Sequence, residues 1–201
     1  ERKSLGKALA PRLIKKYNTD PIIITFIPNT AETAFLGLAE ALTSASFDGK
    51  LPKNFKSERL LHKDQKLRTF ITRDSDRDDL VSHIYDTCKG IVTEKDTLIV
   101  LDDSIVRGTT LRTSIIEALV QLHPKKIVIA SSAPPICYPD CYVIDMSQLG
   151  KFIAFQAAIK LLEEDNEESI LDEIESRCLQ QENEQPKIWK NYVKLLYERI
   201  D

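Results

Sequence analysis

The chain has 201 residues, of which 42% are hydrophobic and 29% are charged, and its formal net charge is −3 at pH 7. This length suffices for one ordinary domain with an appendage, and the composition is that of a soluble globular protein. The small negative net charge provides no broad basic field for nucleic acid. We therefore expect no nucleic-acid partner, and we expect any bound anion to be held by local geometry.

The apolar runs, such as residues 22–26 and 98–101, are far shorter than the roughly 20 residues that a membrane-spanning helix needs. The N-terminal residues ERKSLGKALAPRL lack the apolar stretch and cleavage site of a secretory signal. No membrane partner and a cytoplasmic location are expected. The one close cysteine pair, Cys137 and Cys141, matches no complete zinc or disulfide framework, which favours reduced thiols. Because residue 1 is glutamate, the sequence also fits a piece excised from a longer protein.

Alternating strand and helix patterns predict an α/β fold. Residues 22–26, IIITF, form a β-branched and aromatic run typical of a buried strand, and apolar residues at helical spacing follow over 31–45. The alternation continues with a helix around 78–88, a strand at 97–101, a helix around 111–122 and a strand at 126–131. Helices between continuous apolar strands favour a mostly parallel sheet with helices on both faces.

In such sheets ligands bind beyond the carboxyl ends of the strands. Two strand ends are therefore of interest, Ile27-Pro28-Asn29-Thr30 and residues 102–110. Between them, residues 46–67 lack steady periodicity and predict a long loop, and loops of this length in compact domains are often functional.

The last quarter of the chain is helical in pattern and rich in glutamate. Residues 151–162 and 167–179 have this character, and residues 186–200 again place apolar side chains at helical spacing. We expect one domain at 1–149 and a helical C-terminal extension at 150–201 that packs on it.

Residues 102–110, DDSIVRGTT, join a predicted strand to a predicted helix. The amides at the helix N-terminus, the helix dipole and the close backbone approach that Gly108 allows together form a cup for phosphate. The Thr109 and Thr110 hydroxyls add hydrogen-bond donors, and Arg107 adds a charge at the rim.

Asp102 and Asp103 would repel a phosphate, but they suit a ligand that also carries hydroxyl groups and Mg²⁺. They would accept hydrogen bonds from vicinal ribose hydroxyls and hold the metal. The acidic pair and the phosphate cup together predict a sugar-phosphate site. The alternative is that the carboxylates cap the helix and the threonines form a simple turn.

Residues 98–110, LIVLDDSIVRGTT, closely resemble the phosphoribosyl pyrophosphate (PRPP) motif of amidophosphoribosyltransferases, the enzymes that begin purine nucleotide synthesis. Residues 27–30 resemble the family's pyrophosphate-side loop, and residues 68–71, RTFI, its flexible catalytic loop. The likeness runs from about Ser4 to Gln156. It implies the type I phosphoribosyltransferase fold.

The resemblance implies roles for individual residues. Arg68 would belong to the catalytic lid over PRPP. Thr30, Asp102 and Asp103 would bind the metal, with Mg²⁺ as cofactor, although Thr30 by itself also fits a helix N-cap. The implied PRPP-binding residues are Thr30, Asp102, Asp103, Ser104, Arg107, Gly108, Thr109 and Thr110.

The chain departs from the family at several places. Residues 62–67, HKDQKL, replace the usual Lys-Asn-Arg-Tyr-Val-Gly, which leaves the pyrophosphate contacts open, with Lys63 and Lys66 as candidates. A cluster cysteine of some members aligns with Asp140 rather than Cys141, so no iron–sulfur cluster is expected. The family's glutaminase domain is not expected within these residues and would lie upstream in a full-length chain.

The resemblance implies a pentosyltransferase that forms 5-phosphoribosylamine and pyrophosphate from PRPP and ammonia, which is glutamine-derived in the full-length enzyme. Two alternatives stay open. One is a PRPP-binding regulatory protein, which the altered loop at 62–67 and the acidic tail suggest, and the other is a phosphoribosyltransferase for another acceptor. Assembly into a homo-oligomer is open as well.

Overall fold

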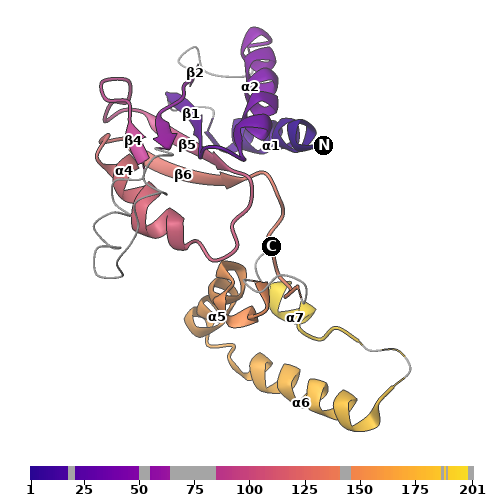
Figure 1. The fold of residues 1–201 in the computed structure, drawn as a ribbon. Coiled ribbons are helices and arrows are strands. Elements are labelled where there is room, and N and C mark those ends of the chain that lie inside the picture. The colour runs from indigo at the N-terminus through magenta and orange to yellow at the C-terminus, as the bar shows by residue number, and fades with distance from the viewer. Residues whose placement is uncertain are drawn as a thin grey trace. The chain divides into compact units, whose positions relative to one another are not determined.

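A computed structural model describes residues 1–17, 21–49, 55–63, 85–140, 146–186, 188 and 190–198. The chain, drawn as a ribbon in Figure 1, divides into two compact units. The first comprises Glu1–Ser104 and Thr109–Pro134, and the second comprises Ile105–Gly108 and Pro135–Asp201.

Within the described residues, the first unit contains a sheet of four parallel strands in the order β2–β1–β5–β6. The strands are β1 (Ile22–Phe26), β2 (Phe55–Ser57), β5 (Thr97–Asp102) and β6 (Lys126–Ser131). In the register, Phe26 pairs with Leu101, and Leu101 pairs with Ala130. The predicted parallel α/β sheet is confirmed, as are its strands at 22–26, 97–101 and 126–131.

Helices cover both faces of this sheet. On one face, α1 (Arg2–Tyr17) and α2 (Glu32–Phe47) pack over alternate strand residues that include Ile24 and Leu101. The residues that point the other way, such as Ile23, are equally buried. Figure 1 shows α4 (Ile116–Val120) on that second side. The central strands β1 and β5 are therefore buried along nearly their whole length, whereas Lys56 and Ser57 of the edge strand β2 are exposed.

The predicted helix at 111–122 is present as helical residues 109–120, and it contains a π-helical turn, η3 (Leu111–Ile115), which runs into α4. The predicted helix at 31–45 is α2, which begins one residue later and ends two residues later than predicted.

The α1 helix was not predicted from the sequence. Its buried residues, Gly6, Ala10, Leu13 and Tyr17, follow helical spacing, yet the first two are small and Pro11 lies inside the helix. Small residues and proline both weaken a helical pattern in the sequence. The helix forms because it packs on α2, where Lys3 and Lys7 also form ion pairs with Glu40.

Two short strands correct two sequence predictions. β3 (Leu61–Lys63) and β4 (Tyr85–Thr87) pair antiparallel as a separate two-stranded sheet among the described residues. The predicted helix at 78–88 is therefore wrong for Tyr85–Thr87, and residues 78–84 lie outside the described residues. The predicted loop at 46–67 contains β2 and β3 as well as the end of α2. Non-local pairing decides the conformation of three-residue strands, which are too short to show a period.

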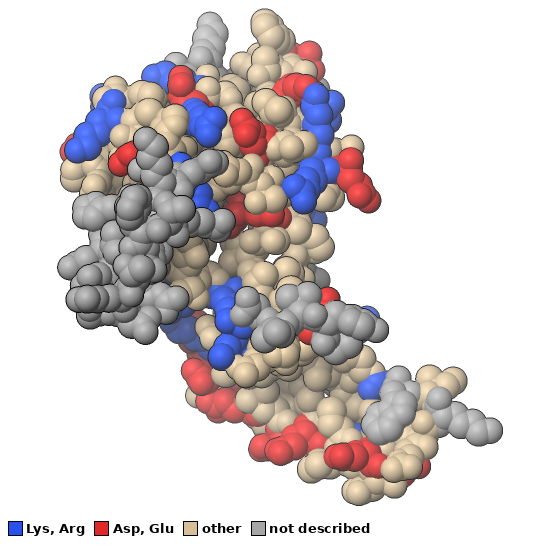
Figure 2. Space-filling view, in the orientation of Figure 1, with Lys and Arg blue, Asp and Glu red and all other residues tan. Residues whose placement is uncertain are grey.

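The second unit is helical among its described residues. It contains the short 3₁₀ turn η5 (Leu149–Lys151) and the helices α5 (Ile153–Asp165), α6 (Ser169–Glu184) and α7 (Lys194–Tyr197). A small apolar core joins them through Ala158, Leu162, Ile174 and Leu196. Figure 2 shows acidic side chains along the surface of this unit. The helices expected at 151–162 and 167–179 are confirmed with shifted ends.

The predicted helix over 186–200 is wrong in extent, since only Lys194–Tyr197 is helical among the described residues there. Gln181, which is buried, explains the difference. Its Nε2 donates to Lys190 O at 2.9 Å, and Lys190 N donates to its Oε1 at 2.6 Å. A side chain thus takes both backbone groups of Lys190 that a helix would use.

In the described part of the chain no helix is both long and apolar enough to cross a membrane. The cytoplasmic location stays a prediction.

Candidate functional site

The sheet brings the two strand ends of interest together. β1 and β5 are neighbours, and the backbone pairing continues one residue beyond β1, where Ile27 N donates to Leu101 O at 2.9 Å. The turn formed by Pro28, Asn29 and Thr30 therefore leaves the sheet beside the residues that follow Leu101. Both segments lie at the carboxyl edge, where ligands of parallel sheets bind.

The backbone of Asp102 and Asp103 is held by the end of β6. Ser132 N donates to Asp102 O at 2.9 Å, and Ala133 N donates to Asp103 O at 3.0 Å. The Ser132 hydroxyl adds a second donor to Asp103 O at 3.2 Å. These bonds fix where the two acidic residues sit. Both side chains are half-buried, as is the following Ser104.

The two carboxylates influence each other strongly. Burial raises the pKa of Asp102 to about 6, and a hydrogen bond from its protonated form to the Asp103 side chain and the Asp103 charge act in the same direction. The backbone N–H of Asp103, which donates to Asp102 Oδ1 at 2.9 Å, opposes the shift in part. The site therefore favours a proton or another cation between these residues.

This raised pKa predicts a pH-dependent stability. The ordinary pKa of 3.8 applies to the unfolded chain, so the folded protein binds the proton more tightly between pH 4 and 6 and loses stability as pH rises through that range. Asp102→Asn cannot ionise and should not show this loss. After discounting for partial exposure, we expect the variant to be more stable above pH 6 by about 1 kcal/mol, or about 2–4 °C in Tm.

Thermal melts of both proteins from pH 3.5 to 8 measure this. The two Tm values should converge below pH 4 and separate between pH 4 and 6. A difference that is constant over the whole range would contradict the assigned ionisation.

Threonines border the carboxyl edge but do not cap helices through their side chains. The N-cap of α2 is Ala31, so the alternative interpretation of Thr30 as that cap is wrong. The helical residues that lead into η3 begin at Thr109, and Thr110 makes no side-chain capping bond. The Asp102 carboxylate accepts a hydrogen bond from Asp103 N instead of from an amide of that helix. Thr30, Thr109 and Thr110 are exposed. The capping alternative is therefore not supported for Asp102.

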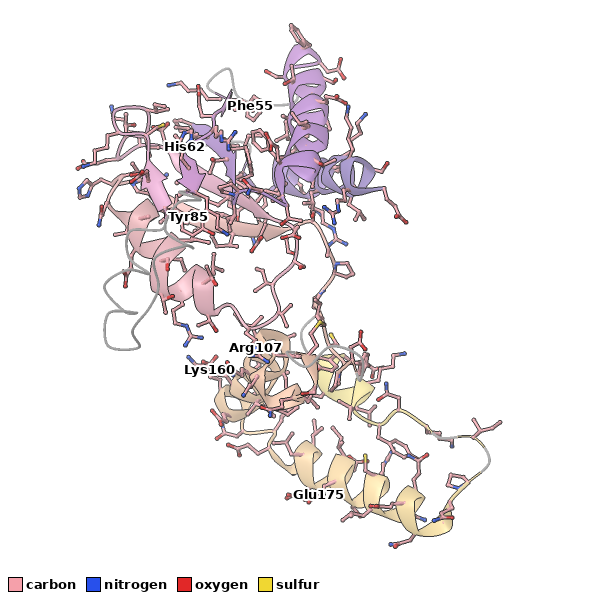
Figure 3. All side chains as sticks on the ribbon, in the orientation of Figure 1. Phe55, His62, Tyr85, Arg107, Lys160 and Glu175 are labelled. Atoms are coloured by element: carbon pink, nitrogen blue, oxygen red, sulfur yellow. The ribbon has the colours of Figure 1, made fainter. Side chains whose placement is uncertain are left out.

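Arg107 and Gly108 belong to the second unit, where they pack at the start of α5. Ile153 N donates to Val106 O at 2.8 Å. Gly108 has φ +67°, and a Cβ at this position would lie 2.9 Å from Ile153 Cδ1, so the turn requires glycine. Figure 3 shows Arg107 near α5. Arg68 and Lys66 lie outside the described residues, so their predicted roles stay predictions.

Arg59 is a cation at this edge that the sequence did not reveal. The segment after β2 is anchored there because Glu58 N donates to Ile24 O at 3.0 Å and Leu60 N donates to the buried Thr25 Oγ1 at 3.1 Å. The Arg59 guanidinium carbon lies 5.6 Å from the centre of the Phe26 ring, at the end of β1. A single arginine in an aperiodic stretch gives no signal in the sequence.

Asp102 and Asp103 suit a Mg²⁺ ion that takes only part of its ligands from the protein. Carboxylate oxygens are the hard ligands that Mg²⁺ prefers, and this ion is commonly held by one or two carboxylates together with water and substrate phosphates. No group of three acidic, histidine or cysteine side chains is arranged for a metal among the described residues. Asp102 and Asp103 therefore fit an ion that binds together with a phosphorylated substrate.

A parallel sheet with an acidic pair and a Gly-Thr-Thr loop after one strand, and a polar turn after its neighbour, defines the class of type I phosphoribosyltransferases, and the fold is of this type. No protein-family model matches the chain. Within that class, the known proteins that the chain resembles in sequence are amidophosphoribosyltransferases. It is 30% identical over 160 residues to the amidophosphoribosyltransferase of Bacillus subtilis (strain 168), which covers 79% of this chain and 30% of that protein.

The amidophosphoribosyltransferase of Haemophilus influenzae is 32% identical over 160 residues, with 77% of this chain and 29% of that protein covered. The solved structure of glutamine PRPP amidotransferase from B. subtilis, complexed with ADP and GMP, aligns with a TM-score of 0.57 and 28% identity over 81% of this chain and 32% of that chain. The resemblance seen in DDSIVRGTT is thus confirmed over most of this chain. The chain spans about 30% of the length of the relatives it matches.

Proposed function

We propose that this chain is the phosphoribosyltransferase part of an amidophosphoribosyltransferase, and that it forms 5-phosphoribosylamine and pyrophosphate from PRPP and ammonia at the first step of purine nucleotide synthesis. The ammonia would come from glutamine through a glutaminase domain, and the similar B. subtilis protein is itself named a glutamine PRPP amidotransferase. Residues 1–149 would form the transferase domain, with the extension at 150–201 packed on it.

One observation supports this proposal above the others. The turn at 27–30 and the acidic pair leave adjacent strands at the same edge, as the bond from Ile27 N to Leu101 O shows. PRPP carries a pyrophosphate on ribose C1 beside the ribose hydroxyls. A site for it therefore needs a pyrophosphate side and a hydroxyl-binding side that are adjacent, and the two segments meet this need.

The acidic pair would position the sugar. Asp102 and Asp103 would accept hydrogen bonds from the two ribose hydroxyls, since their backbone is held by Ser132 and Ala133 and does not need to reorganise. The loop of Ser104, Arg107, Gly108, Thr109 and Thr110 would receive the 5'-phosphate.

Cleavage at C1 develops positive charge on the ribose and negative charge on the departing pyrophosphate. Thr30 would donate to the pyrophosphate, and Arg59 at the end of β1 would attract its charge. Arg68 would complete the site from the lid. A bound Mg²⁺ would supply further neutralisation of the pyrophosphate. Ammonia is nucleophilic when neutral, so the site does not need a strong base.

The test is pyrophosphate release from PRPP with Mg²⁺, with and without ammonia. We expect release that rises with the concentration of free ammonia. If PRPP raises Tm without any release, the chain is a PRPP-binding regulatory protein. Release with another amine or a base, but not with ammonia, would identify a transferase for another acceptor.

A further inference from the structure

The two-stranded sheet of β3 and β4 brings a cysteine and a histidine into contact. Cys88 Sγ lies 3.4 Å from His62 Nε2. Cys88 follows β4 directly, and its backbone is fixed because Cys88 N donates to Leu60 O at 3.0 Å. In the imidazole tautomer that carries its proton on Nδ1, Nε2 accepts the thiol hydrogen. This contact is that of a nucleophile with a general base.

An acidic residue shares the same face of this sheet. Asp86 pairs with His62 across the strands, so the two side chains lie on one face. Cys88 comes two residues after Asp86 and lies on that face too. Figure 3 shows His62 on β3 and Tyr85 on the neighbouring β4.

The pair is open to small reagents. His62 and Asp86 are exposed and Cys88 is half-buried. The Cys137 thiol is less available for reaction than that of Cys88, because it donates to Pro135 O at 3.5 Å and burial raises its pKa. The Cys178 thiol is also less available than that of Cys88, because Cys178 packs against the apolar core of the second unit.

We propose that Cys88 is a site of thiol–disulfide exchange with small disulfides such as glutathione disulfide, with His62 as the base. His62 Nε2 takes the proton from Cys88 Sγ while the sulfur attacks one sulfur of the disulfide. A new S–S bond forms, the old one breaks, and the departing thiolate takes the proton from the imidazolium. The Cys88 sulfur is oxidised and the departing sulfur is reduced.

The experiment is to incubate the native protein with glutathione disulfide at pH 7 and to measure the adduct on each cysteine by peptide mass spectrometry. We expect Cys88 to react about tenfold faster than Cys178, and His62→Asn to slow Cys88 by about tenfold or more, because a positioned base contributes at least this factor. The rates of Cys137 and Cys178 should not change in the variant.

His123→Asn is the matched control, since His123 is also exposed and the histidine that contacts Cys88 Sγ is His62. It should leave the Cys88 rate unaltered. In urea, where the contact between Cys88 Sγ and His62 Nε2 is lost, Cys88 should react no faster than Cys178. If Cys88 reacts no faster than Cys178 in the folded wild type, or if His62→Asn leaves its rate unchanged, the proposal is wrong. The wild-type comparison decides this even if the variant is unstable.

Discussion

Replacing Asp102 or Asp103 with asparagine should reduce pyrophosphate release from PRPP by about 100-fold or more while the protein stays folded. Each carboxylate would accept a charge-assisted hydrogen bond from ribose and share in holding Mg²⁺. The loss of such interactions with a charged group costs about 1.5–3 kcal/mol each, and 100-fold corresponds to about 2.7 kcal/mol.

Asparagine separates binding from folding at Asp102 because it resembles the protonated acid. Its Oδ1 can still accept from Asp103 N, and its amide can still donate to the Asp103 carboxylate in place of the proton that the site favours. The Asp102→Asn variant is therefore expected to be less active and, above pH 6, at least as stable as the wild type. A site that holds charge for a ligand shows this combination.

Asp172→Asn provides the control, because Asp172 is an exposed acidic residue on α6. It should change neither release nor Tm. If Asp102→Asn and Asp103→Asn release pyrophosphate at the wild-type rate, the acidic pair does not bind the substrate. If both variants unfold, their role is structural.

The second large effect is expected at the crossing of α1 and α2. A Cβ on Gly37 would lie 2.0 Å from Lys3 O, and a Cβ on Gly6 would lie 1.8 Å from Ala34 O. Both obstacles are backbone atoms, so a methyl group must push the helices apart. Overpacking costs about 1–3 kcal/mol and occasionally more, while alanine regains about 1 kcal/mol of helix propensity.

We therefore expect Gly37→Ala to destabilise the protein by about 2 kcal/mol, which lowers Tm by about 4–8 °C. Gly150→Ala is the matched control, since nothing lies within 4 Å of a Cβ there, and its effect should stay within about 0.5 kcal/mol. Urea melts of both variants measure the difference. Equal stability of Gly37→Ala and wild type would show that the two helices do not cross at these glycines.

The elements that the sequence predicts well are those in which local pattern and tertiary context agree. β1 and β5 are continuous apolar runs because both faces of the sheet are covered at these strands. The acidic pair was recognisable because it stands in DDSIVRGTT, between a buried strand and a Gly-Thr-Thr segment that leads into a helix. That the pair and the turn at 27–30 share the carboxyl edge follows from parallel topology, and the pairing of β1 with β5 makes them neighbours.

What the sequence hides depends on non-local contacts. The strand at Tyr85–Thr87 exists through pairing with Leu61–Lys63, and three residues show no period by themselves. The Cys88–His62 contact spans 26 positions along the chain, so no spacing rule would reveal it. In the same way, Gln181 directs the backbone of Lys190 away from the helix that its neighbours favour.

Calorimetric titration of the folded protein with PRPP in the presence and absence of Mg²⁺ tests the central claim most directly. The proposed site predicts one PRPP bound per chain, with affinity that depends on Mg²⁺ and is lost in Asp102→Asn and Asp103→Asn but kept in Asp172→Asn. Absence of binding heat together with an unchanged Tm at millimolar PRPP would contradict it.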